Sequence, residues 1–448
     1  MAKIYPRVLI VGHAFHNSNG AGITLTNLFR DWPADRLAVI KLNGKDKDLL
    51  NYDVCSNYYF LGSDETEVMF PLSIFQRVNR SQIADGNRRP MERAESLIST
   101  DRGDHREKSL GERMLKRVLR LSGLDSIKYS YRISDNLHQW IDDFGPDVMY
   151  SALGDLDLVR FMLKMTNEFK CKIAIHIWDD WPNTLFQRTL LPGIWGRKFQ
   201  SEFAQLIERT DIRLSISESM SEQYHRNYNR SFVPFHNPVD LQQWGNCGKI
   251  LGKTDRERVL YFGKMERDNL KSLKLMAEVI DELNETGRKE IEFVLYSPQF
   301  ATFRKAFSRY KRVFVKEPLR HDELQLEVRK ASILFLPLDF GSKSVQYARL
   351  SMPTKSTEYM ASGVPTIVLA HPEIALNKYT KEKEWALLVE EFDKKQLSNA
   401  VLELLRDDIV RSALTERAQK LARLEHSGPD VREKFRQCLA GECTTHAD

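Results

Sequence analysis

Short β-branched runs alternate with amphipathic stretches along this chain, and no other feature of the sequence limits its fold as strongly. Most of the runs lack an alternation of apolar and polar residues, which is typical of parallel strands covered on both faces. Alternating strands and helices imply parallel sheets with right-handed crossovers. The expected strands, six in each half, are residues 7–11, 37–42, 147–150, 172–177, 212–216 and 232–235, then 259–262, 292–296, 312–315, 333–336, 366–369 and 386–389.

A chain of 448 residues is too long for one ordinary hydrophobic core. The join between the halves follows His236-Asn237-Pro238, after which 241–253 is polar and a new strand begins at Arg258. We therefore expect an α/β fold with two doubly wound domains that face each other across a cleft, where a nucleotide would bind at the strand ends. The predicted domains are 1–240 and 250–405, with a helical segment 406–448 packing back across both.

The composition is that of a soluble globular protein, with 42% hydrophobic and 29% charged residues. No apolar run reaches the roughly 18 residues that a membrane span requires. The first residues do not have the layout of a signal peptide. These features predict a cytoplasmic protein.

Residues 77–120 depart from the alternation and carry 12 Arg or Lys against 7 Asp or Glu, a local net charge of +5. Their middle part has few large apolar residues, so we expect a mobile insertion. At 110–121 the apolar residues share one helical face and basic residues occupy the rest. A helix of this kind can lie on an anionic membrane, which for a cytoplasmic protein is the inner face of the cell membrane. Alternatively, it packs its apolar face on its own domain. Nucleic acid binding is not expected, because no aromatic residues are interleaved with the basic ones.

A glycine-containing loop follows the first strand and includes Gly20 and Gly22. Glycines at this place let the backbone approach a phosphate or a sugar, with the N–H groups of the next helix pointing at it. The spacing is not that of the G-x-G-x-x-G loop of dinucleotide enzymes. A tight turn without a ligand is the alternative.

Two segments of the second half carry groups suited to a nucleoside diphosphate. In the first, a strand ends at Gly263, and Lys264 and Arg267 follow as candidate charges for the phosphates. In the second, Pro353, Thr354 and Lys355 open a short helix whose N–H groups and dipole would face the diphosphate. Glu358 lies inside this helix, where its carboxylate can accept hydrogen bonds from both ribose hydroxyls.

Two adjacent acids, Asp179 and Asp180, follow the strand at 172–177 and lie between Trp178 and Trp181. Two acids at the end of a buried strand are costly unless they open onto a site. Each carboxylate can raise the pKa of the other, which suits a group that handles a proton. Alternatively, one acid caps the following turn. We take both as candidate catalytic residues.

Together these motifs resemble those of GT-B glycosyltransferases related to carbohydrate-active family 4, the glycosyl transferases group 1, over nearly the whole chain. The most specific match is 353–365, where the family commonly reads P-x-K-x-x-E-Y-M-A-x-G-x-P. The resemblance implies two Rossmann-like domains, the second holding a nucleotide-diphosphate sugar and the first an acceptor. It also implies that no metal or other cofactor is needed. The other matching segments are 20–22, 179–182, 215–219, 237–240 and 260–264.

Carried over by position, Glu358 matches the ribose-binding glutamate of the family, Lys264 its first phosphate-binding base, and Gly20 with Gly22 its glycine loop. Gly20 and Gly22 therefore join the donor-binding candidates, although the resemblance implies that the donor is held mainly by the second domain.

Three positions depart from the family pattern. Leu350 replaces a glutamate that contacts the sugar in many members, and Trp178 replaces a histidine. Asn269 offers no clear match to the second base of the phosphate pair. The altered motifs are those that bear on the catalytic residue and on stereochemistry.

The expected function is a metal-independent glycosyltransferase of the hexosyltransferase type that uses a UDP- or GDP-sugar. Its acceptor would be a saccharide or a lipid-linked glycan in the synthesis of an envelope or exported polysaccharide or glycolipid, with peripheral contact to an anionic membrane. A catalytically inactive GT-B scaffold is one alternative, motivated by Leu350 and Trp178. A nucleotide-sugar epimerase is the other, kept open by the paired acids.

Overall fold

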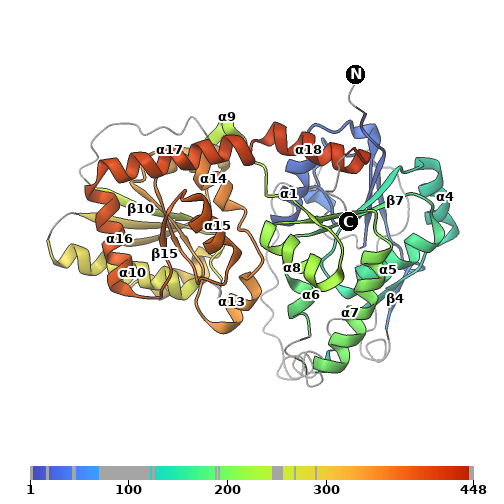
Figure 1. Cartoon of the computed structure of the whole chain (residues 1–448), viewed down its shortest axis with the longest axis horizontal. Helices are drawn as coiled ribbons and strands as arrows, with labels where there is room; N and C mark the ends of the chain where they lie inside the picture. The colour runs from blue at the N-terminus through green and yellow to red at the C-terminus, as the bar shows by residue number, and fades with distance from the viewer. Residues whose placement is uncertain are drawn as a thin grey trace.

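The computed structural model describes residues 4–16, 20–42, 47–69, 122–123, 127–186, 189, 192–244, 256–266, 269–287 and 290–442. The predicted basic insertion at 77–120, the predicted helical stretch at 110–121 and the candidate residue Arg267 all lie outside the described residues. Two parallel sheets with helices around them form two lobes that lie side by side (Figure 1). The arrangement confirms the predicted α/β class.

The first sheet is parallel and has the strand order β3-β2-β1-β6-β7-β8-β9. Its strands are almost wholly apolar and buried, as expected for a sheet covered on both faces. A separate antiparallel pair, β4 (Thr66–Val68) with β5 (Tyr129–Tyr131), lies outside it. The strands of the sheet are β1 (Val8–Gly12), β2 (Leu37–Lys41), β3 (Tyr58–Phe60), β6 (Val148–Ala152), β7 (Lys172–Ile177), β8 (Ile212–Ser215) and β9 (Val233–Pro234).

The prediction of six strands for the first half was wrong, because β3 adds a seventh strand at the edge of the sheet and the pair β4 and β5 lies outside it. The strand β3 is only three residues long and pairs with β2 alone. A run this short carries too little periodicity to be separated from a loop.

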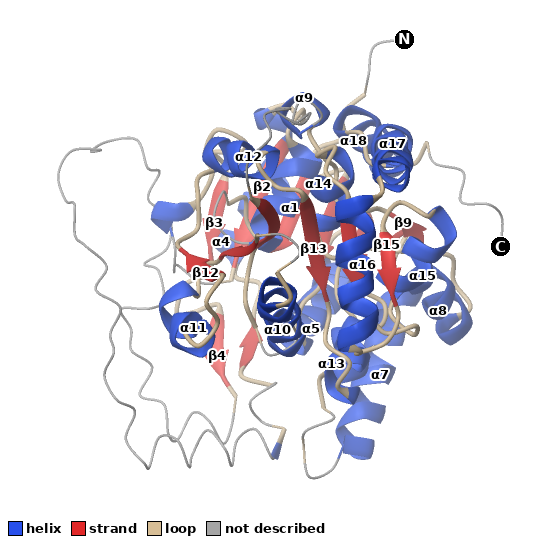
Figure 2. Ribbon diagram, turned by 90° about the vertical axis from the view of Figure 1, so that its left-hand side faces the viewer, coloured by secondary structure: helices blue, strands red, loops and turns tan. Residues whose placement is uncertain are grey.

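The second sheet is also parallel, with the order β12-β11-β10-β13-β14-β15, and contains the six strands expected there. The helices α10 and α16 contact each other, as do α14 and α17. Figure 2 shows these pairs beside the strands of this sheet. The strands are β10 (Glu257–Phe262), β11 (Ile291–Tyr296), β12 (Val313–Lys316), β13 (Ile333–Pro337), β14 (Thr366–Leu369) and β15 (Leu387–Val389).

Three helices of the first lobe, α4, α5 and α8, begin at side chains that accept a backbone hydrogen bond. Ser134, Asp155 and Ser217 each accept from the N–H three residues on, which satisfies a donor that the helix itself leaves free. The helices are α1 (Gly20–Phe29), α4 (Asp135–Phe144), α5 (Leu156–Glu168), α6 (Trp181–Thr184), α7 (Pro192–Glu208), α8 (Glu218–Tyr228) and α9 (Leu241–Trp244).

The last predicted helical stretch is interrupted at His426 and Ser427, and a new helix begins at Gly428 with Pro429 in its first turn, where a proline is tolerated. None of the described helices is both long and apolar enough to span a membrane. The helices after residue 256 are α10 (Leu270–Glu285), α11 (Phe300–Phe307), α12 (His321–Arg329), α13 (Ser342–Ala348), α14 (Lys355–Ala361), α15 (Ala375–Lys383), α16 (Lys394–Arg406), α17 (Asp408–Glu425) and α18 (Gly428–Ala440).

The break between α17 and α18 is the point at which the chain returns from the second lobe to the first. Figure 1 shows α17 along the second lobe and α18 against the first, where Phe435 packs with Phe29 of α1. The return crosses the outgoing segment, and the two pair as Val239 N–H to His426 C=O and Gly428 N–H to Val239 C=O, each 2.9 Å. The two lobes are thus joined by paired chain segments.

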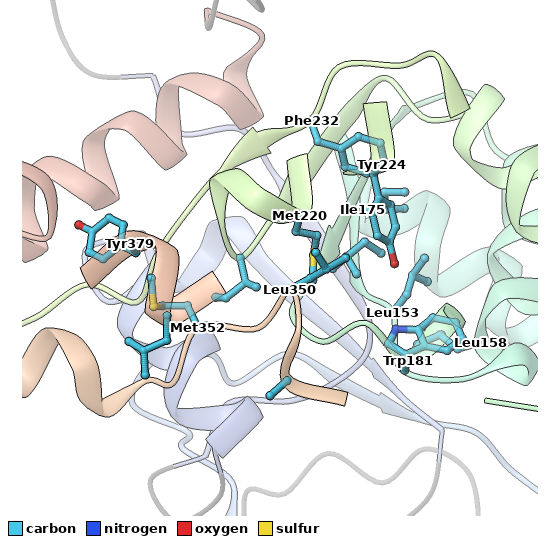
Figure 3. Close-up of a cluster of buried hydrophobic side chains, with 14 of the residues drawn as sticks. Leu153, Leu158, Ile175, Trp181, Met220, Tyr224, Phe232, Leu350, Met352 and Tyr379 are labelled. Atoms are coloured by element: carbon cyan, nitrogen blue, oxygen red, sulfur yellow. The ribbon is translucent and has the colours of Figure 1, made fainter. Parts of the chain in front are cut away.

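One apolar cluster runs through both lobes. Figure 3 shows Leu350 and Met352 of the second lobe beside Met220 and Tyr224 of the first, and all four side chains are buried. Burial of this apolar surface stabilises the contact between the lobes.

Candidate active site

Each sheet reverses its strand order at one place, and the candidate residues follow the strands at these places. The reversal lies between β1 and β6 in the first sheet and between β10 and β13 in the second. In open parallel sheets, ligands bind at the carboxyl ends of the strands beside such a reversal. His13 follows β1, and Gly263 follows β10.

Lys355 of α14 lies directly over Gly263. Gly263 has a φ of +129°, and a Cβ added there would stand 2.9 Å from the Cδ and the Cε of Lys355. Few residues other than glycine adopt this backbone conformation, and none with a side chain would leave the lysine in place. The glycine predicted as donor-binding therefore makes room for a lysine from another element.

The hydroxyl of Tyr261 ties this lysine to the loop after β10. Lys355 Nζ lies 3.0 Å from Tyr261 Oη and 4.3 Å from the centre of its ring. Tyr261 Oη donates to the main-chain oxygen of Lys264. Asn269 Nδ2 donates to the same two oxygens, at 3.0 Å each. The loop that contains Lys264 is thereby held against α14, and the Lys264 side chain is exposed.

Glu358 lies one turn beyond Lys355 on the same helix. Its side chain is half-buried, while the neighbouring Tyr359 and Met360 are fully buried, as expected from the sequence. Burial raises the pKa of the Glu358 carboxyl to about 7, and the positive charge of Lys355 opposes the rise. The carboxyl therefore changes its charge near neutral pH.

The short helix α14 begins at Lys355, two residues later than predicted from the Pro-Thr-Lys segment. Thr354 is the N-cap, is exposed and makes no side-chain capping bond, and Pro353 precedes it. The C=O of Pro353 accepts from Ser356 N–H at 3.0 Å and from Ser356 Oγ at 2.6 Å. Pro353 and Thr354 thus shape the start of the helix.

The first turn of the longer helix α10 already has a carboxylate partner. Asp339, which is buried, accepts from Ser272 N–H at 2.8 Å and from Lys271 N–H at 3.3 Å. The N–H groups that a helix end would offer to an anion are occupied here. Among the charged side chains described around Gly263, Lys264 and Lys355 are therefore the ones placed for a diphosphate.

In the first lobe, His13 and Trp178 meet at the carboxyl edge of the sheet. Their ring centres are 5.6 Å apart. Burial, and secondarily the charge of Lys41, lowers the pKa of His13 to about 4, so this ring is neutral at neutral pH. Gly20 and Gly22 begin α1 in the same lobe. His176, by contrast, is a buried core residue whose Nδ1 lies 2.8 Å from the hydroxyl of Tyr150.

The two adjacent acids face different surroundings. Asp179 is exposed, and its Oδ1 accepts from Ser351 Oγ at 3.2 Å. Asp180 is only 1% exposed, and its Oδ1 accepts from Asn183 Nδ2 at 2.6 Å. Burial raises the pKa of Asp180 to about 6, and the neighbouring Asp179 contributes less to this rise than burial does.

The partners of both acids include residues of the second lobe. Ser351 reaches Asp179, and Arg349 reaches Asp180, with its Nη2 3.8 Å from Asp180 Oδ2. Leu350 lies between Arg349 and Ser351, and its C=O accepts from Ser217 Oγ at 2.7 Å. The Leu350 side chain belongs to the apolar cluster of Figure 3. The position where many family members have a sugar-contacting glutamate therefore packs the two lobes together.

The structure thus brings the predicted residues into two groups. Gly263, Lys264, Lys355 and Glu358 gather at one end of the second sheet, while Asp179 and Asp180 meet the segment 349–351. Sequence reasoning missed the residues that complete these groups. Tyr261 carried no signal of its own, and Asn269 was noted only as a departure from the family pattern. Arg349 can be recognised only from a contact between the lobes. The residues that the sequence did not indicate are Tyr261, Arg349, Ser351 and His13.

Comparison with known proteins places the chain in a structural class. A family model described as glycosyl transferases group 1 matches residues 256–407. A search of curated protein sequences gives no significant match. An alpha,alpha-trehalose-phosphate synthase (UDP-forming) from Burkholderia vietnamiensis is similar in structure, with a TM-score of 0.59 and 11% identity over 98% of this chain and 99% of that chain.

Two further solved structures are similar over comparable lengths. Sucrose-phosphate synthase from Thermosynechococcus elongatus has a TM-score of 0.58 and 12% identity, covering 97% of this chain and 99% of that chain. HepE from Anabaena, in complex with UDP and glucose, also has a TM-score of 0.58 and 12% identity, covering 97% of this chain and 100% of that chain. At such identities the similarity shows a common fold, which is the predicted GT-B fold.

The family match covers the second lobe and includes the group formed by Gly263, Lys264, Lys355 and Glu358. Family and fold together support a transferase, and the resemblance seen in the sequence motifs is confirmed. The chain has the GT-B fold, and its residues 256–407 match the model of the glycosyl transferases group 1 family.

Proposed function

We propose that this protein transfers a sugar from a nucleotide-diphosphate sugar, with a UDP-sugar as the first candidate, to a saccharide acceptor. The observation that carries the proposal is the group of Lys355, Lys264 and Glu358 around Gly263, within the region that matches the family. HepE, which has the same fold, has been solved with UDP-glucose. Glu358 would accept from the ribose hydroxyls, and the two lysines would lie on the diphosphate.

Lys355 supplies the second positive charge for the phosphates, because the uncharged Asn269 occupies the position of the family's second phosphate-binding base. The amide of Asn269 donates to Tyr261 and to Lys264 C=O, and the same tyrosine holds Lys355. Lys355 and Lys264 would together balance the charge that develops on the departing nucleoside diphosphate, so that no metal is needed. Preorganised charges of this kind typically contribute about 3–4 kcal/mol each to the transition state.

The acids of the first lobe would lie on the acceptor side of this donor. Asp179 is exposed and meets the second lobe at Ser351, so it is placed to contact an acceptor hydroxyl or the transferred sugar. Asp180 is buried behind it and is suited to hold the local geometry and charge. We assign the catalytic contact to Asp179 and a supporting part to Asp180.

A saccharide or lipid-linked glycan is the proposed acceptor, and an anionic membrane surface is the proposed site of action. The net charge of +5 in residues 77–120 supports this assignment. Deletion of 77–120 is expected to abolish binding to phosphatidylglycerol vesicles, measured by co-sedimentation. Unchanged binding of the deletion variant would remove the membrane from the proposal.

A non-catalytic scaffold is the second candidate, and the buried position of Leu350 favours it. A scaffold and an enzyme would both bind the nucleotide. They differ in turnover, because an enzyme also hydrolyses a bound donor slowly when no acceptor is present. Release of UDP from UDP-glucose over hours therefore separates the two.

The nucleotide site is tested by thermal unfolding of the purified protein with UDP, GDP, ADP and CMP, since a ligand that binds the folded state raises its stability. We expect a selective shift with one nucleoside diphosphate. Glu358→Ala should weaken its binding by about 10- to 100-fold, the usual worth of hydrogen bonds to a charged group. Glu416→Ala, an exposed glutamate of α17, is the matched control. Unchanged affinity in the Glu358 variant would overturn the assignment.

A further inference from the structure

The two oxygens of the buried Asp180 carboxyl are held in different ways. Oδ1 accepts from Asn183 Nδ2 at 2.6 Å and from Tyr224 Oη at 3.3 Å, both in the first lobe. Oδ2 has no hydrogen-bond partner among the described residues and is buried from solvent. A guanidinium nitrogen of Arg349 stands 3.8 Å from it. Oδ1 is thus hydrogen-bonded within the first lobe, whereas Oδ2 faces the positive charge of Arg349.

Arg349 belongs to the second lobe. It follows α13, and its main-chain oxygen accepts from Ala375 N–H at 2.8 Å, which fixes the segment to α15. Its side chain is 37% exposed, whereas that of Asp180 is 1% exposed. The next residue, Leu350, packs against Met220 across the boundary in Figure 3. The ion pair therefore exists only while the two lobes are in contact.

Among the described residues of the first lobe, the groups that face Asp180 bring no positive charge. The hydroxyls of Tyr224 and Tyr228 face it from α8, and Asp179 adds a like charge from the same loop. A buried carboxylate that loses its cation is costly, and the usual outcome is that it binds a proton. Separation of the lobes would take Arg349 away, whereas Asn183 and Tyr224 of the first lobe would stay on Oδ1 and would bring no positive charge to balance the carboxylate.

We propose that Arg349 is a positioning residue that couples the ionisation of Asp180 to the contact between the lobes. With the lobes together, Asp180 is a carboxylate paired with Arg349. With the lobes apart, Asp180 takes up one proton from solvent, and closure returns that proton to solvent. The place of Asp180 beside the reaction rests on the proposed function, whereas the coupling itself does not.

Stability as a function of pH tests the coupling without any substrate. Loss of the cation in Arg349→Met should raise the pKa of Asp180 by about one unit. A raised pKa means that the folded protein binds the proton more tightly than the unfolded chain does. The stability lost in the variant should therefore grow as the pH rises from 5 to 8.

Three further variants make this measurement specific. Arg349→Lys keeps the charge and should restore most of the wild-type pH dependence. Arg417→Met removes a surface ion pair with Glu384 inside the second lobe and should cause a loss that does not vary with pH. In an Asp180→Asn background, Arg349→Met should lose its pH dependence. A pH-independent loss in Arg349→Met, or the same dependence in the Asp180→Asn background, would overturn the proposal.

Proton release on binding UDP gives a second measurement. Calorimetry at pH 6.5 in buffers of different ionisation enthalpy counts the protons released. If UDP draws the lobes together, the wild type should release more protons than Arg349→Met, and any contribution from Glu358 is common to both. Equal release by the two proteins would contradict the coupling. Absence of UDP binding to the wild type would count against the proposed donor, and the stability measurement would still decide the coupling.

Discussion

The two groups of candidate residues differ in where their partners lie. In the second lobe, Lys355, Tyr261 and Asn269 hold the loop of Lys264 through contacts that all belong to that lobe. In the first lobe, Asp179 and Asp180 each have a partner that comes from the opposite lobe. The proposed donor site is formed within one lobe, whereas the acid pair gains these partners only where the two lobes meet.

This difference predicts that nucleotide binding and the chemical step depend on different contacts. A site held by its own lobe is preorganised, so a nucleotide meets it with little further cost of ordering. Acids whose partners lie across a boundary change their surroundings when the lobes move. Variants inside the second lobe should therefore act mainly on nucleotide affinity, and those at the boundary mainly on pH dependence and turnover.

The strongest test of the preassembled donor site is Gly263→Ala. The new Cβ would collide with the Lys355 side chain and occupy a backbone conformation with φ +129° that is hostile to alanine. We expect a stability loss of about 1–3 kcal/mol. A loss of UDP affinity of about 100-fold should accompany it, near the upper end for contacts to charged groups. Urea unfolding measures the change in stability, and isothermal calorimetry measures the change in UDP affinity.

Gly287→Ala is the matched control for backbone strain. Gly287 also has a positive φ, +69°, but a Cβ there would meet no atom within 4 Å among the described residues. This variant should lose about 1 kcal/mol of stability and keep its affinity for UDP. Equal affinity losses in the two variants would show that Gly263 acts only through the backbone.

A smaller effect is expected for Lys355→Met, which removes the cation and keeps the length of the side chain. UDP affinity should fall about tenfold at pH 8, the usual worth of one charged contact. In the wild type, affinity should weaken below pH 7, because the Glu358 carboxyl has a pKa of about 7 and its protonated form accepts fewer hydrogen bonds. Without Lys355, which lowers that pKa, the weakening should begin at higher pH.

Lys271→Met serves as the control, since its side chain is exposed and only its main-chain N–H is engaged, by Asp339. It should leave both the affinity and its pH dependence unchanged. If the pH dependence of UDP affinity is the same in Lys355→Met as in the wild type, Lys355 does not affect the ionisation of Glu358. The two residues would then not act as one group.

Much of the fold is readable from local patterns. The strands at 172–177 and 366–369 lie where their apolar runs predict, because a buried parallel strand needs a continuous apolar run. The three-residue strand β3 escaped notice, since so short a run has no period. The helical pattern at 406–440 did not indicate the break at His426-Ser427, where the chain changes lobes.

The sequence by itself determined the two-lobe α/β class, the segment 353–365 and the candidates Gly263, Lys264, Lys355 and Glu358, because strand and helix periods and short motifs are local properties of a chain. The tertiary structure decided that Lys355 crosses over Gly263 and that Tyr261 ties it there. It alone paired Asp180 with Arg349, 169 positions apart. Contacts at that separation depend on how two finished sheets pack, and no local pattern of residues encodes that packing.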